Sequence, residues 1–202
     1  MEDTYKTIKD SSQGIYKEKG SKFIAYAMPV NSREQIKEYL ADIKKSNHSA
    51  RHYCFAWVIG YNREDYRIND DGEPSGTAGK PIYGQILSKN ITNVLIVVVR
   101  YFGGVKLGKG GLINAYRKAA AEALKNAVII TKTIRETYRL HFEYPLMSDV
   151  MKIFNEHDIE QLERRFELDC TIDFSVRKKD KTKVVALFES LENIKIQHLH
   201  TT

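Results

Sequence analysis

The feature that most constrains the fold is a nearly all-apolar run from Val94 to Tyr101, followed by a glycine-dense loop and an alanine-rich segment. Such a run suits a central β-strand that is covered on both faces. Between Gly111 and Lys125, Leu112 and Tyr116 belong to one apolar stripe at helical spacing. We therefore expect a buried strand, a glycine loop and a helix packed against the sheet, in that order.

Glycine and charge both divide the chain near Thr131. All 12 glycines lie at or before Gly111. Residues 1–130 carry 20 Lys and Arg against 13 Asp and Glu, a balance of +7, whereas residues 131–202 carry 12 against 13, a balance of −1. A hydrophobic fraction of 42% is sufficient for well-formed cores. We expect two domains, residues 1–130 and 131–202, in an α+β fold.

Local patterns predict the other elements of the first domain. Lys22–Val30 is typical of a strand, and Ser32 is placed to cap a helix that follows it. His52–Ile59 and Tyr66–Ile68 are expected to form a hairpin, and Pro81 to open a short helix.

The second domain is predicted to have the element order βαββαβ. Its expected segments are a strand at Ile134–Glu143, a helix led by Pro145, strands at Ile159–Phe166 and Leu168–Val176, a helix at Lys181–Leu191 and a strand at Ile194–Leu199. This order in about 70 residues is the ferredoxin-like arrangement, a sheet with two helices on one face.

Two cysteines without a CxxC spacing, Cys54 and Cys170, disfavour a disulfide framework or a zinc site and fit a reducing cytoplasm. The N-terminal segment lacks a signal-peptide pattern, and no apolar run is long enough to span a bilayer. We expect a soluble cytoplasmic protein with no membrane partner, and nothing in the sequence indicates a cofactor.

The clearest functional signal is a stretch without acids. Between Pro74 and Ala121 there is no Asp or Glu, but there are seven basic residues. This composition indicates a positive surface for an anionic partner, most commonly nucleic acid. Five glycines in residues 103–111 would let backbone amides approach a phosphate. The predicted phosphate-binding residues are Arg100, Lys106, Lys109, Gly103, Gly104, Gly110, Gly111, Arg117, Lys80, Arg51, His52 and Lys22.

Two other interpretations of the glycine loop are open. Gly103–Lys109 matches the G-x-x-x-x-G-K part of a P-loop, but Gly110 stands where a P-loop needs Ser or Thr to bind Mg²⁺. Alternatively, the glycines only permit a tight crossing and close helix packing.

The acidic trio Asp70, Asp71 and Glu73 could hold a hard cation or act as general acid and base, but a solvated turn is the simpler interpretation, because Asp and Gly are favoured in turns. Cys54 could pair with a histidine as a nucleophile. Its apolar neighbours favour an inert core thiol instead.

Two longer motifs resemble the signatures of the IMPACT family, in particular its bacterial YigZ/YvyE-like branch. They are Asp70-Asp71-Gly72-Glu73-Pro74-Ser75-Gly76-Thr77-Ala78-Gly79-Lys80-Pro81 and Val99-Arg100-Tyr101-Phe102-Gly103-Gly104-Val105-Lys106-Leu107-Gly108-Lys109-Gly110-Gly111-Leu112. The resemblance extends over about residues 15–125.

The resemblance implies an N-terminal α/β sandwich like domain 2 of ribosomal protein S-five and a C-terminal domain like domain V of elongation factor G. Both of those relatives handle RNA or the ribosome. Eukaryotic members restrain the kinase response to amino-acid starvation, but through an additional RWD module that we do not expect here, so that role is not carried over. The resemblance establishes no catalytic reaction.

The leading hypothesis is a cytoplasmic protein that binds RNA or the ribosome, with a link to translation regulation and without catalysis. An enzyme acting on a phosphorylated small molecule is the first alternative, with Arg100, Lys106 and Lys109 holding the phosphate. A protein-interaction module is the second.

Overall fold

The computed structural model describes residues 3–167 and 169–202. It is a mixed α/β protein whose chain divides into two compact units. One unit comprises Tyr5–Lys132, and the other comprises the described residues of Thr133–Thr202 together with Asp3 and Thr4. Within the described residues, no helix combines the length and the apolar character needed to cross a membrane.

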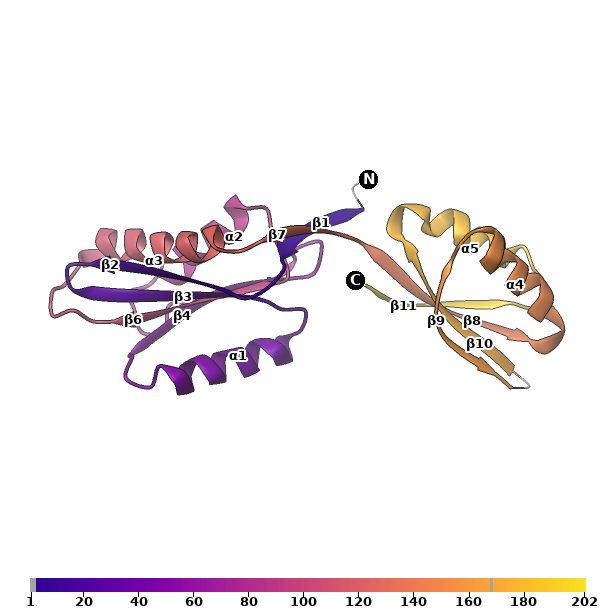
Figure 1. Ribbon diagram of the computed structural model, residues 1–202, viewed down its shortest axis with the longest axis horizontal. Helices are drawn as coiled ribbons and strands as arrows, with labels where there is room; N and C mark the ends of the chain where they lie inside the picture. The colour runs from indigo at the N-terminus through magenta and orange to yellow at the C-terminus, as the bar shows by residue number, and fades with distance from the viewer. Residues whose placement is uncertain (1–2, 168) are drawn as a thin grey trace. The chain divides into compact units, whose positions relative to one another are not determined.

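The unit of residues 5–132 is built on a five-stranded antiparallel sheet with the order β2-β3-β6-β4-β5 (Figure 1). The strands are β2 (Ser12–Glu18), β3 (Ser21–Pro29), β4 (His52–Ile59), β5 (Asp65–Asn69) and β6 (Val94–Tyr101). The helices are α1 (Arg33–Ser46), α2 (Gly79–Ser88) and α3 (Gly108–Lys125). A separate two-stranded ladder pairs β1 (Thr4–Ile8) with β7 (Ile129–Thr133).

Strand β6 is the middle strand and is covered on both faces, as its composition predicts. Helices α2 and α3 lie over one face and α1 over the other (Figure 1). Because neighbouring side chains of a strand point to opposite faces, Val94, Ile96 and Val98 belong to the core beneath α2 and α3. Leu95 and Val97 belong to the core beneath α1. The expected hairpin of β4 and β5 is also confirmed.

The start of a helix agrees with its prediction where a hydrogen bond between near neighbours in the chain caps it. The Ser32 side chain accepts a hydrogen bond from the backbone N–H of Gln35 at the start of α1, as expected. Helix α3 begins at Gly108 rather than at Gly111, directly after Leu107. Leu107 packs against the core beneath α2 and α3, and this contact anchors the first turn despite the poor helix propensity of glycine. Helix α2 begins two residues before Pro81, which is allowed because the first helical amides need no intrahelical acceptor.

The second unit has the βαββαβ element order. It contains β8 (Arg135–Glu143), α4 (Met147–Glu156), β9 (Glu160–Phe166), β10 (Asp169–Arg177), α5 (Lys181–Glu189) and β11 (Lys195–Thr201), with short 3₁₀ turns η1 (Tyr144–Leu146) and η2 (Lys178–Asp180). The predicted start of β10 at Leu168 lies outside the described residues.

The four strands of this unit form an antiparallel sheet with the order β11-β8-β10-β9. Both helices cover one face of the sheet (Figure 1). Its core is aromatic: Phe154, Phe174 and Phe188 are mutually in ring contact, with centroids 4.9–5.6 Å apart. The expected Pro145-led helix is a 3₁₀ turn that leads into α4.

Candidate functional site

Three predicted site residues lie side by side at one end of the five-stranded sheet. Arg100 is the penultimate residue of β6, and in the register of the sheet it stands opposite His52 of β4 and Phe23 of β3. Lys22 of β3 stands opposite Tyr101. The three central strands therefore bring their polar residues together where the glycine loop begins.

Two hollows open at this end of the sheet. The first, here called the Glu73 hollow, has a volume of about 330 Å³ and is lined by Glu73, Pro74, Arg100, Phe102, Lys106, Leu107, Gly108, Lys109 and Leu112. The second, here called the Arg51 hollow, has a volume of about 350 Å³ and is lined by Ser49, Arg51, His52, Arg100, Tyr101 and Phe102. Because Arg100 and Phe102 line both, the hollows adjoin.

Phe102 is the site residue that sequence analysis missed. It follows the last residue of β6, and 58% of it is exposed. Its ring centroid lies 5.6 Å from the guanidinium carbon of Arg100. A bulky aromatic residue directly before a glycine loop was the available signal, since such a residue has little room to be buried there.

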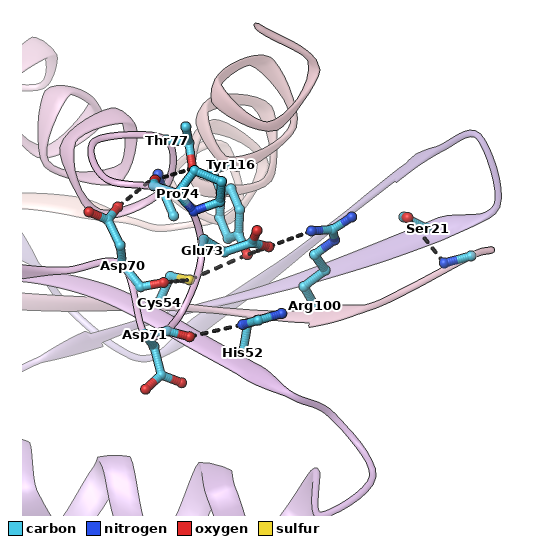
Figure 2. Close-up of polar contacts among 12 residues, drawn as sticks. Ser21, His52, Cys54, Asp70, Asp71, Glu73, Pro74, Thr77, Arg100 and Tyr116 are labelled. Atoms are coloured by element: carbon cyan, nitrogen blue, oxygen red, sulfur yellow. Dashed lines mark hydrogen bonds and ion pairs between the residues drawn. The ribbon is translucent and has the colours of Figure 1, made fainter. Parts of the chain in front are cut away.

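Arg100 is not a free surface cation. Its Nη1 donates to Oε1 of Glu73 at 2.6 Å, and the side chains are only 8% and 4% exposed (Figure 2). Glu73 directly precedes the acid-free stretch that begins at Pro74. Its carboxylate neutralises Arg100, which lies near the middle of that stretch. The positive charge exposed around the hollows therefore comes from Arg51, Lys106 and Lys109.

A buried hydrogen-bond chain supports the Arg100–Glu73 pair. The Tyr116 hydroxyl donates to the same Oε1 of Glu73 at 2.8 Å, and the Cys54 thiol lies 3.3 Å from that hydroxyl (Figure 2). Burial raises the pKa of both the Cys54 thiol and the Tyr116 hydroxyl. Both groups are therefore neutral near pH 7, which disfavours Cys54 as a nucleophile.

The acidic trio does not converge on one point. The two oxygens of Asp70 accept the backbone N–H groups of Gly76, Ala78 and Gly79, which holds the start of α2. Asp71 Oδ2 accepts the N–H of Tyr53 at 2.7 Å. Within residues 3–167 and 169–202, no group of three His, Cys, Asp or Glu side chains is placed to hold a metal ion.

His52 is held by the same turn. Its Nδ1 lies 2.9 Å from the carbonyl oxygen of Asp71, and its side chain is half-buried (Figure 2). Because the turn fixes the ring beside Arg100, His52 forms part of the wall of the Arg51 hollow.

The glycines of the loop divide into packing and open positions. A Cβ on Gly103 would lie 1.9 Å from the carbonyl carbon of Gly20, and its N–H already donates to Ser21 Oγ. Gly103 therefore serves a tight backbone crossing. A Cβ on Gly104 or Gly110 would meet nothing within 4 Å. The backbone is open at these two positions, whereas at Gly111 the added atom would meet Leu107 at 3.0 Å.

Not every predicted basic residue belongs to the hollows. Lys80 lies in the first turn of α2, and Arg117 is exposed on α3. Neither Lys80 nor Arg117 nor Lys22 lines either hollow. The structure thus gathers Arg51, His52, Arg100, Lys106 and Lys109 at the hollows, and leaves Lys22, Lys80 and Arg117 outside their linings.

Comparisons with known proteins give one consistent family. A family model described as the Impact N-terminal domain matches residues 19–124. The IMPACT family member YvyE of Bacillus subtilis is 31% identical over 177 residues, which cover 88% of this chain and 82% of that protein. The IMPACT family member YigZ of Escherichia coli is 34% identical over 142 residues, which cover 69% and 70%. A crystal structure of a hypothetical protein shares the fold, with a TM-score of 0.76, 24% identity and 99% coverage of both chains.

Proposed function

The chain belongs to the IMPACT family, and from the geometry of its N-terminal unit we propose that it is a cytoplasmic RNA-binding protein linked to translation. One observation carries this proposal. Arg51, Lys106 and Lys109, from two segments far apart in the sequence, line two adjoining hollows that both include the exposed residue Phe102.

This combination suits single-stranded RNA. A cationic groove attracts the phosphate chain, and an exposed aromatic ring offers a surface on which a base can stack. The open amides near Gly104 and Gly110, together with the start of α3, add donors for a phosphate oxygen. Glu73 does not repel an anion strongly, because Arg100 neutralises it in the buried pair.

We further propose that residues 1–130 form a domain like domain 2 of ribosomal protein S-five, and that residues 131–202 form one like domain V of elongation factor G. The five-stranded sheet with helices on both faces and the antiparallel βαββαβ unit support this assignment.

The test is the salt dependence of binding to a labelled single-stranded RNA. Each phosphate contact on a single strand contributes about −0.7 to the slope of log affinity against log salt. We expect Lys106→Glu with Lys109→Glu to weaken binding to RNAs of any sequence and to flatten that slope by about 1.4.

The matched control is Lys37→Glu with Lys89→Glu. These lysines are exposed, belong to α1 and to the end of α2, and line neither hollow. The control changes the net charge equally and should bind almost as tightly as the parent. If both double variants lose the same affinity, binding follows overall charge and the hollows are not the site.

A protein partner is the other outcome to be distinguished. If the parent binds no RNA but captures a protein from nuclease-treated lysate, and the Lys106 and Lys109 variant does not, the same surface serves a protein instead.

A further inference from the structure

The floor of the Glu73 hollow carries polar groups whose hydrogen-bonding capacity is only partly used. Arg100 and Tyr116 both donate to Oε1 of Glu73, so neither of these bonds occupies Oε2. The bond from Arg100 uses only Nη1, and its Nε is buried without a hydrogen-bond partner. A buried guanidinium with an unused donor is costly and calls for a physical reason, and a polar ligand beside it is one such reason.

The walls of this hollow are mainly apolar. Phe102, Pro74, Leu107 and Leu112 line it. Its volume of about 330 Å³ is at the small end of the range of ligand pockets, roughly 300–1,000 Å³, so it has room for a single base. Lys106 and Lys109 line it as well, and both are exposed, as expected for groups that meet the phosphates of an entering chain.

We propose that the Glu73 hollow takes a single guanine base from the bound RNA, an inference that rests on the RNA-binding function proposed above. Guanine presents an acceptor, O6, next to two donors, the N1–H and the N2 amino group. Arg100 offers a guanidinium donor and Oε2 of Glu73 an acceptor that neither Arg100 nor Tyr116 uses, side by side. This arrangement complements that edge of guanine.

The other bases do not match this pattern. Uracil has a single ring N–H between two carbonyl oxygens, so one of its acceptors would face the carboxylate. Adenine and cytosine each present an amino donor next to a ring acceptor, so they leave one carboxylate contact unmade. Stacking on Phe102 would be similar for every base, so the polar floor supplies the discrimination.

The experiment measures binding of U-rich RNA nonamers whose central base is guanine, hypoxanthine, adenine or uracil, by fluorescence anisotropy at one salt concentration. We expect guanine to bind about 5- to 150-fold more tightly than uracil. Hypoxanthine differs from guanine only by lacking the N2 amino group. It should lose about tenfold, because a hydrogen bond to a charged carboxylate is missing.

Two protein variants complete the test. Glu73→Gln replaces one carboxylate oxygen with an NH₂ group, which donates a hydrogen bond and cannot accept one from the N2 amino group of guanine. The variant should therefore lose the preference for guanine over hypoxanthine. Phe102→Ala should weaken all four RNAs by a similar factor, with Tyr66→Ala as its control, since Tyr66 is a 53% exposed aromatic on β5. If Glu73→Gln does not fold, the affinities of the parent protein for the four RNAs are sufficient to support or overturn the guanine site.

The outcomes separate this inference from the function on which it rests. Equal affinity for the guanine and hypoxanthine RNAs, with binding that still falls with salt, overturns the guanine site and leaves RNA binding intact. Failure to bind any of the four RNAs overturns RNA binding itself. A guanine preference that survives Glu73→Gln places the recognition elsewhere and also overturns the site.

Discussion

Removal of the Arg100 charge should destabilise the N-terminal unit far more than removal of an exposed charge. In Arg100→Met the side chain keeps an apolar stem against Phe23 and Phe102, but Glu73 is left 4% exposed without its cation. Breaking a buried ion pair on one side costs about 3–5 kcal/mol. Such a loss is a large part of the total stability of a domain, about 5–15 kcal/mol, and corresponds to a fall in Tm of about 10–20 °C.

The single tryptophan makes this measurement specific to one unit. Trp57 is 5% exposed in β4, so its fluorescence reports unfolding of residues 5–132 and not of the second unit. Guanidinium titrations of the parent, Arg100→Met, Glu73→Gln and the double variant form a double-mutant cycle. Lys125→Met, which breaks only an exposed contact to Glu122 at 3.9 Å, should leave the midpoint nearly unchanged.

The double variant buries no charge, so we expect it to be more stable than the sum of the two single changes predicts, with a coupling energy of about 1–3 kcal/mol. Additive effects, within about 0.5 kcal/mol, would refute the reasoning, because they would mean that the two charges do not depend on each other. The reasoning would also be refuted if Arg100→Met lowered the free energy of unfolding by no more than Lys125→Met does.

Two further predictions concern stability. Gly103→Ala should lower the free energy of unfolding by at least about 1–3 kcal/mol, because the backbone atoms of Gly20 cannot move aside. Gly110→Ala should leave the free energy of unfolding unchanged or raise it by up to about 1 kcal/mol, because the added Cβ meets no other atom. Equal unfolding midpoints for the two variants in a denaturant titration would contradict the tight backbone crossing at Gly103. A hydrogen bond from Arg139 holds the pKa of Asp173 below its ordinary value, so the charged carboxylate stabilises the second unit above about pH 4, and this contribution is lost as the pH falls through the lowered pKa. An NMR titration of the Asp173 carboxyl should show its pKa rising in Arg139→Met, and an unchanged titration would rule out this cause.

The sequence predicts best what is decided locally. The cap at Ser32 depends on one hydrogen bond three residues away, and the central position of β6 follows from an apolar composition on both of its faces. The βαββαβ order is readable because each apolar run has the period of its own element. These features depend on neighbours in the chain, which a sequence displays directly.

The site was less predictable because its contacts join distant segments. Arg100 and Glu73 are 27 residues apart, and a count of charges in the acid-free stretch cannot show that its central arginine is neutralised from outside. Gly103 and Gly104 are adjacent glycines that the sequence cannot tell apart. Only the structure shows that Gly103 packs against Gly20, whereas the space beside Gly104 is open. The start of α3 was misplaced because tertiary packing outweighed glycine propensity.

The second unit combines Asp3, from the beginning of the printed sequence, with residues of 133–202. The N–H of Ile134 donates to the carbonyl oxygen of Asp3 at 2.6 Å, and the Asp3 carboxylate pairs with Arg177 at 3.2 Å. Arg135 exchanges two backbone hydrogen bonds with Thr202, at 2.8 and 2.9 Å. During synthesis, Asp3 therefore has neither partner until Ile134 and then Arg177 have been translated. A truncated fragment that starts at residue 131 lacks this partner permanently, so no single cut separates the two units intact.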